Sequence, residues 1–95
     1  MHIGAARITL YLPEAMSLKE KRRVVKSVVD RARNRFNAAI SEVEDLDDLR
    51  VATIGIAVVS NDSRHADEML QTIIGFFERD ADANLGEVET EVLLF

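Results

Sequence analysis

Apolar and polar positions alternate near the start of the chain, from residue 5 to residue 12. The apolar positions are Ala6, Ile8, Leu10 and Leu12. A period of two residues is typical of a β-strand that buries one face. The pattern therefore predicts a first strand that is closed by Pro13, the single proline of the chain.

A helical pattern replaces this alternation at Ser17. This serine stands three residues before Glu20, which is the spacing of a capping box, where a hydroxyl and a carboxylate satisfy the free amides at a helix start. The apolar residues that follow fall on one side of a helical wheel. They are Leu18, Val25, Val28, Val29, Ala32 and Phe36. The sequence therefore predicts an amphipathic helix that begins after Ser17.

The middle of the chain predicts two strands and a connector. A short strand over residues 37–43 precedes the acidic connector EDLDDLR, and a long apolar strand covers Val51–Ser60. A second helix follows, for which Asn61, Asp62 and Ser63 are alternative N-caps. Its apolar positions recur at helical spacing and are Ala66, Met69, Leu70, Ile73, Ile74 and Phe77.

The last segment alternates again and predicts a closing strand. The odd-numbered positions carry three glutamates, Glu87, Glu89 and Glu91. The even-numbered positions carry Val88, Thr90, Val92 and Leu94. The predicted order is thus strand, helix, strand, strand, helix, strand.

Two strand–helix–strand units in this order predict an α+β fold, the ferredoxin-like βαββαβ sandwich. A four-stranded antiparallel sheet then carries two helices on one face, and residues 1–95 form a single domain. We assign to the covered face Ala6, Ile8, Leu10, Ile54, Ile56, Val58, Val88, Val92 and Leu94. We assign to the open face Arg7, Thr9, Tyr11, Thr53, Gly55, Ala57, Glu89 and Glu91. On that face we expect Arg7 to pair with a glutamate across strands.

Composition narrows the class of protein. With 47% apolar and 31% charged residues, the chain has the composition of a soluble globular domain. It has no cysteine, which excludes disulfides, thiol catalysis and a zinc-finger site and suits the cytoplasm. No apolar run approaches the roughly 20 residues of a membrane span. We therefore expect a cytoplasmic protein with no membrane segment.

Catalytic chemistry is not evident in the sequence. The loop LPEAMS lacks the glycines and arginine of an acylphosphatase-like phosphate cradle, and His65 has no serine or acid at a diagnostic spacing. The acidic connector lacks the spacing of an EF-hand, so we interpret it as a solvated loop near the predicted first helix. We therefore expect a protein that is not an enzyme, with no catalytic residues, no cofactor and no metal.

Charge is distributed unevenly. The net charge is −5, yet residues 17–36 hold eight of the twelve Lys and Arg residues and only two acids. Five of these bases lie on one flank of the predicted first helix, namely Lys19, Arg22, Arg23, Lys26 and Arg33. Several lie near the helix N-terminus, where the macrodipole disfavours cations by about 0.3–1 kcal/mol each at low salt. We expect two intrahelical ion pairs, Glu20 with Arg23 and Lys26 with Asp30.

Three interpretations of this flank stay open. Long basic side chains often lie solvated over the edge of a core, or pair with acids of the same chain. The flank could instead contact RNA or a ribosomal particle, or bind an acidic protein partner. An RNA-recognition domain that stacks bases on its central strands is disfavoured, because Val51–Ser60 holds no aromatic residue and the first strand offers only Tyr11.

The open sheet face offers a second candidate surface. Gly55 and Ala57 form a small apolar patch there, which another copy of the sheet could cover. The sequence therefore also predicts a homodimer with these two residues in its interface.

Two strings, SLKEKRRVVKS and ATIGIAVVSND, together resemble the small bacterial YlxP-like family, a domain of unknown function. The resemblance spans nearly the whole chain and implies a ferredoxin-like fold in the bacterial cytoplasm. It also implies genes that lie beside translation and ribosome-maturation factors, but no catalytic residue set. The leading hypothesis is thus a non-enzymatic module that contacts RNA or the ribosome through its basic first helix. The alternative is a homodimeric structural or regulatory protein-interaction module.

Overall fold

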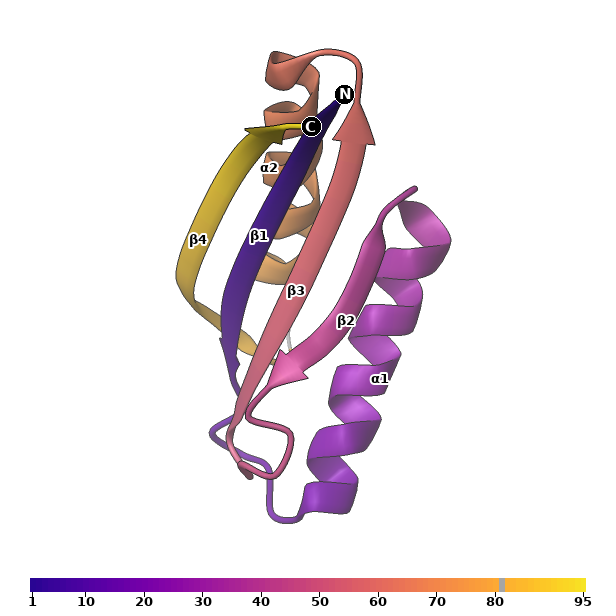
Figure 1. Cartoon of the computed structure of the whole chain (residues 1–95). Helices are drawn as coiled ribbons and strands as arrows, with labels where there is room; N and C mark the ends of the chain where they lie inside the picture. Colours follow the sequence, from indigo (N-terminus) through magenta and orange to yellow (C-terminus); the bar gives the residue numbers. More distant parts are fainter. Residues whose placement is uncertain (81) are drawn as a thin grey trace.

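A computed structural model describes every residue of the chain except Ala81. Three elements form the first half: strand β1 (His2–Tyr11), helix α1 (Leu18–Arg35) and strand β2 (Ala39–Glu44). The second half repeats this order with strand β3 (Val51–Ser60), helix α2 (Ser63–Glu78) and strand β4 (Asn84–Leu94). Figure 1 shows the elements in the expected sequence, with both termini at the same end of the sheet.

The four strands form one antiparallel sheet in the order β2-β3-β1-β4. Helix α2 packs behind β1, β3 and β4, whereas α1 packs on the edge strand β2 (Figure 1). This arrangement confirms the ferredoxin-like α+β fold. Within the part of the chain that the structure describes, no helix covers the second face of the sheet, which is called the open face below.

Both helices begin at the predicted caps. The Ser17 hydroxyl accepts a hydrogen bond from the Glu20 amide at 3.1 Å, and Glu20 Oε2 accepts one from the Met16 amide at 3.3 Å. Of the three alternatives for α2, Asp62 is the N-cap, and its side chain accepts from the Arg64 amide at 3.2 Å. Each cap side chain therefore satisfies one of the free amides at its helix start.

Side chains of the covered face form the core with the buried stripes of both helices. Ile8, Leu10 and Ile54 are at most 1% exposed, as predicted. Val88 and Leu94 lie on the predicted face, opposite Ile8 and His2, but they are not buried: Val88 is 42% exposed and Leu94 is 78% exposed. Both lie on β4, an edge strand on which only Leu85 and Val92 pack against the core. Within the described residues, no helix has the length and apolar character needed to cross a bilayer.

Candidate functional site

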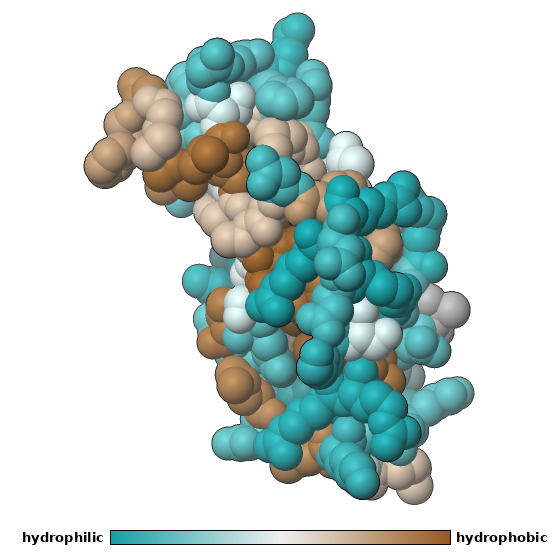
Figure 2. Space-filling view, turned by 90° about the vertical axis from the view of Figure 1, so that its right-hand side faces the viewer, coloured by the Kyte–Doolittle hydropathy of each residue, from teal (hydrophilic) through white to brown (hydrophobic). Residues whose placement is uncertain are grey.

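The basic flank of α1 consists of Lys19, Arg22, Arg23, Lys26 and Arg33, and all five residues are exposed. Figure 2 views the side of the molecule that carries α1, and hydrophilic side chains run along much of it. The structure therefore brings the five predicted residues together on one solvent-facing side of a single helix.

Acidic partners neutralise part of this flank. Arg22 Nη2 lies 3.7 Å from Asp47 Oδ1 in the β2–β3 connector. Lys26 Nζ donates to Asp30 Oδ2 at 2.7 Å, as predicted, and this hydrogen bond lowers the pKa of Asp30 below its ordinary value of 3.8. Such exposed pairs contribute little to stability, so they leave these cations free to exchange partners.

Two bases of the flank have no acidic partner within the described residues. Lys19 forms no ion pair there, and neither does Arg23. The predicted pair of Arg23 with Glu20 is absent because the Glu20 carboxylate accepts a hydrogen bond at the helix start instead. Positive charge is therefore least compensated in the first two turns of α1.

Arg33 differs from the other four. Its Nε donates to the carbonyl of Ile40 at 2.8 Å, and its Nη1 lies 3.7 Å from Asp30 Oδ1. Ile40 belongs to the edge strand β2, so Arg33 links the end of α1 to an otherwise unpaired backbone group of the sheet. This residue has a structural bond that the rest of the flank lacks.

Lys21 is a basic residue of α1 that does not belong to the predicted flank. Its side chain is fully buried, and Nζ donates to the Asp45 carbonyl at 2.6 Å and lies 3.2 Å from Glu42 Oε2. The signal was present in the pattern, because Lys21 stands four residues before Val25 and seven before Val28, in the middle of the buried stripe. Lys21 therefore belongs to the interior and not to the anion-facing surface.

The acidic connector is anchored at its start. Asp45 adopts φ 63°, a left-handed conformation that short polar residues tolerate, next to a bulge between Glu42 and Glu44. Its Oδ2 accepts a hydrogen bond from Thr53 Oγ1 at 2.6 Å, and Thr53 is only 4% exposed. Thr53 therefore lies on the predicted open side of the sheet, opposite Thr9, but it is buried and adds nothing to the exposed surface. Among the described residues, no group of three His, Asp or Glu side chains could hold a metal ion.

Side chains form rows across the open face, because directly opposed residues in an antiparallel sheet share a face. The three rows nearest the chain termini are apolar, small and charged. The apolar row is Ile3, Val59 and Leu93. The alanine row is Ala5, Ala39 and Ala57, and it ends at Glu91 on β4. The charged row is Ser41, Gly55, Arg7 and Glu89. The open face therefore changes from apolar to charged along the strands.

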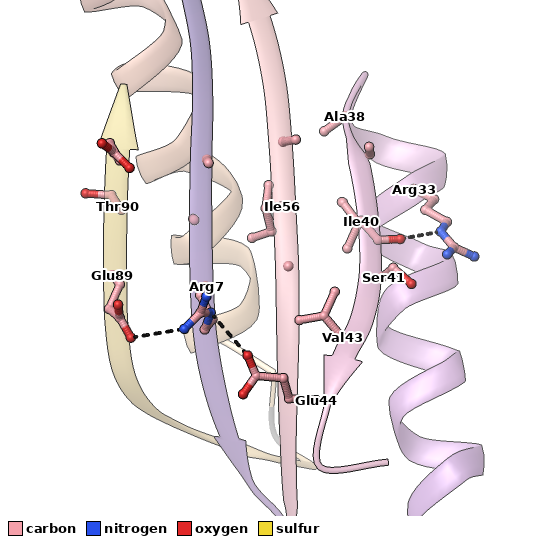
Figure 3. Close-up of a pocket in the computed structure, with 16 residues that line it drawn as sticks. Arg7, Arg33, Ala38, Ile40, Ser41, Val43, Glu44, Ile56, Glu89 and Thr90 are labelled. Carbon is pink, nitrogen blue, oxygen red and sulfur yellow. Dashed lines mark hydrogen bonds and ion pairs between the residues drawn. The ribbon is translucent and has the colours of Figure 1, made fainter. Parts of the chain in front are cut away.

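The alanine and charged rows form a broad open trough (Figure 3). It extends from Arg33 beside β2 to Glu89 and Glu91 on β4. In its centre Arg7 lies 3.6 Å from Glu44 and 4.0 Å from Glu89, which confirms the predicted cross-strand pairing. The trough is too wide and shallow to enclose a small molecule, so it resembles a docking surface more than a ligand pocket.

The two residues predicted for a dimer interface both line this trough. Ala57 is exposed, whereas Gly55 is half-buried beneath Val43. A Cβ atom added at Gly55 would lie 2.9 Å from Val43 Cγ1. Substitutions at Gly55 would therefore displace the side chain of Val43, and Ala57 is the cleaner probe of this surface.

Apolar side chains dominate the end of the open face where the termini lie. Val59 is 62% exposed, Leu93 is 43% exposed and Phe95 is 83% exposed. The terminal residues are joined by hydrogen bonds, with the amide of Phe95 2.8 Å from the carbonyl of Met1. Figure 2 shows apolar surface gathered at this upper end of the molecule. Large exposed apolar patches of this kind are typical of interaction surfaces.

Sequence comparison relates the chain to proteins without an assigned activity. Residues 3–90 match the model of a family described as "Protein of unknown function (DUF503)". The uncharacterized protein YlxP of Bacillus subtilis (strain 168) is 37% identical over 76 residues, which cover 80% of this chain and 83% of that protein.

Structural comparison finds solved structures that resemble this chain in fold alone. The de novo designed protein Foldit4 has a TM-score of 0.52 at 13% identity, with 100% of this chain and 99% of the design covered. A dimeric ferredoxin-like protein from an uncultured marine organism has a TM-score of 0.50 at 10% identity, with 100% of this chain and 98% of that chain covered.

Proposed function

The chain belongs to the DUF503 family, and from that premise we propose that it is a non-enzymatic module that binds RNA along the basic flank of α1. The observation that carries this proposal is the uncompensated charge at the start of α1. Lys19 and Arg23 find no acidic partner within the described residues, although the helix N-terminus favours anions and disfavours cations. An external polyanion would neutralise this positive charge and remove its unfavourable interaction with the helix dipole.

The neighbouring pairs add to the same surface. Arg22 and Lys26 hold exposed acids, and a phosphate backbone can displace such partners because exposed ion pairs are weak. The four bases of the N-terminal half span about 10 Å along the helix axis, at 1.5 Å per residue. A nucleic-acid strand presents several phosphates over that distance.

Recognition through phosphates fits the rest of the molecule. Tyr11 is the only aromatic residue of the two central strands, and its ring packs against Gly86 instead of standing free for a base. Stacking on the sheet therefore contributes little, and the contacts are electrostatic and indifferent to sequence. The family resemblance implies that the gene lies beside genes for translation factors. This gene neighbourhood favours RNA as the polyanion.

Charge reversal on α1 tests this proposal. The variant Arg22→Glu with Arg23→Glu should bind a fluorescently labelled RNA hairpin at least about tenfold more weakly at low salt, because each lost phosphate contact removes released counterions. Its plot of log affinity against log salt should also be shallower by about 1 for each lost contact. Fluorescence anisotropy over a salt series measures both.

A second variant separates location from net charge. Arg64→Glu with Arg79→Glu changes the charge by the same amount at the two ends of α2, so it should bind the hairpin nearly as the parent does. If the α1 variant also binds like the parent, the flank is a solvated helix face. The protein-interaction module that uses the open sheet face would then be the remaining candidate function.

A further inference from the structure

At the height of the alanine row, the open face carries opposite charges at its two edges. Arg33 stands beside β2 and is bonded to the carbonyl of Ile40, whereas Glu89 and Glu91 project from β4. The register places these groups at one height along the strands, because Ile40 is opposed through β3 and β1 to Thr90, between the two glutamates. One edge therefore complements the other edge of the same molecule.

We propose that a second copy of this chain packs face to face on the open face, related by a two-fold axis parallel to the strands. This operation keeps the height of each residue along the strands and exchanges the two edges, so β2 of one copy lies over β4 of the other. Arg33 then meets Glu89 and Glu91 of the second copy, twice in each dimer. The inference is independent of RNA binding.

The same axis brings the apolar ends of the two open faces into contact. Val59 on β3 lies over Ile3 of the second copy, and Ala57 lies over its Ala5. The small side chains of the alanine row allow the sheets to approach closely, as in aligned sheet packing. An axis across the strands would instead place the apolar row on the charged row.

Other ways to join two sheets are blocked. The outer edge of β2 is occupied by α1 and by the bond from Arg33 to Ile40. Edge-to-edge pairing of two β4 strands would place Glu89 and Glu91 beside the same residues of the other copy, and like charges across a strand pair are destabilising. The open face is the surface that remains for self-association.

The available area is sufficient for a dimer. Three strands of ten or eleven residues and the six-residue β2, about 4.8 Å apart and rising about 3.3 Å per residue, present a flat face of roughly 600 Å² per copy. Two such faces bury roughly 1,200 Å², the lower end of the range for stable interfaces. The dimer should therefore dissociate on dilution and respond strongly to one substitution at its centre.

Ala57→Arg tests the contact at the centre. The parent should sediment as a dimer at high protein concentration, and this variant should sediment as a monomer, since a long charged side chain separates the two alanine rows. Gln71→Arg on the exposed side of α2 adds the same charge elsewhere and should remain dimeric. A parent that stays monomeric at every concentration, or an Ala57→Arg variant that dimerises like the parent, overturns the proposal.

Charge exchange tests the axis. The double variant Glu89→Arg with Glu91→Arg and the single variant Arg33→Glu should each be monomeric, because each places like charges together twice. Mixing the two variants should form a heterodimer, since both contacts then join opposite charges, and native mass spectrometry distinguishes it by mass. Circular dichroism verifies that Arg33→Glu is folded. If both folded variants fail to associate when mixed, the two-fold arrangement is wrong, while the Ala57→Arg result still reports on the face.

Discussion

Lys21 places a charged amine in the interior, where an ion needs both a counter-ion and hydrogen bonds. Glu42 supplies the counter-ion, and the Asp45 carbonyl supplies a hydrogen bond at 2.6 Å. Glu42 Oε2 is buried and has no well-directed hydrogen bond, so its charge depends on the nearby amine. This single side chain therefore connects the start of α1 to the end of β2 and the following connector.

Replacing Lys21 by methionine should lower the free energy of unfolding by about 3 kcal/mol, because Glu42 is left unpaired beside the core. The double variant Lys21→Met with Glu42→Leu should recover most of this loss, since the unpaired charge is removed as well. Urea denaturation followed by circular dichroism measures both changes.

Lys26→Met is the matched control, because Lys26 lies on the same helix but is exposed. Its midpoint of denaturation should stay close to that of the parent. Equal losses from the two lysine substitutions would show that burial does not decide the role of Lys21.

At the scale of elements, contacts on two sides hold α1 in place, one toward β2 and one toward α2. Its buried stripe packs toward β2, and its flank reaches β2 and the connector through Arg33 and Arg22. On the side toward α2, Arg31 Nη2 lies 2.7 Å from Asp80, and Arg35 lies over the ring of Phe76 at 5.7 Å. The bases of α1 therefore divide into structural residues and the free residues of its first two turns.

The pair of Asp30 with Lys26 makes the stability of the folded chain depend on pH. The folded pKa of Asp30 lies below its ordinary value of 3.8, chiefly because the ammonium of Lys26 donates to the carboxylate. The resulting stabilisation is complete above pH 3.8 and is lost as the pH falls through the folded pKa.

NMR titration of the Asp30 carboxyl carbon measures this pKa directly. In Lys26→Met the pKa should rise toward 3.8, and well above that pH, where the carboxyl group is fully ionised, the signal should no longer change with pH in either protein. An identical pKa in the two proteins would mean that the hydrogen bond is not formed in solution.

At the scale of the molecule, the two proposed surfaces lie on different sides. The free bases project from the N-terminal half of α1, whereas the contact with a second copy uses the open face of the sheet. Only Arg33 belongs to both the predicted basic flank and the trough. A dimer would therefore leave Lys19, Arg22, Arg23 and Lys26 of each copy accessible.

Self-association should be visible in thermal stability. If only the folded chain dimerises, mass action raises the Tm of the parent as protein concentration increases. The Tm of Ala57→Arg should not depend on concentration. Differential scanning calorimetry over a range of concentrations provides the comparison, and a constant Tm for the parent would contradict a dimer linked to folding.

Periodicity and turn chemistry predicted most of the architecture. Ser17, Asp62 and the two helical stripes lie where the pattern placed them, because caps and amphipathic faces are local properties of the sequence. The exposure of Val88 and Leu94 was not predictable in this way. Alternation defines which side of a strand is apolar, but the position of the strand in the sheet determines whether anything covers it.

The candidate surfaces show the same division. The sequence by itself determined the basic flank, the alternation that places Ala57 on the open face, and the family. Only the tertiary structure decided which charges are free: it buried Lys21 against residues more than twenty positions away, bonded Arg33 to the edge of β2, and aligned Arg33 with Glu89 and Glu91 across four strands. The physical reason is that helix and strand periods are set by neighbouring residues, whereas desolvation and ion pairing depend on whatever the fold brings into contact.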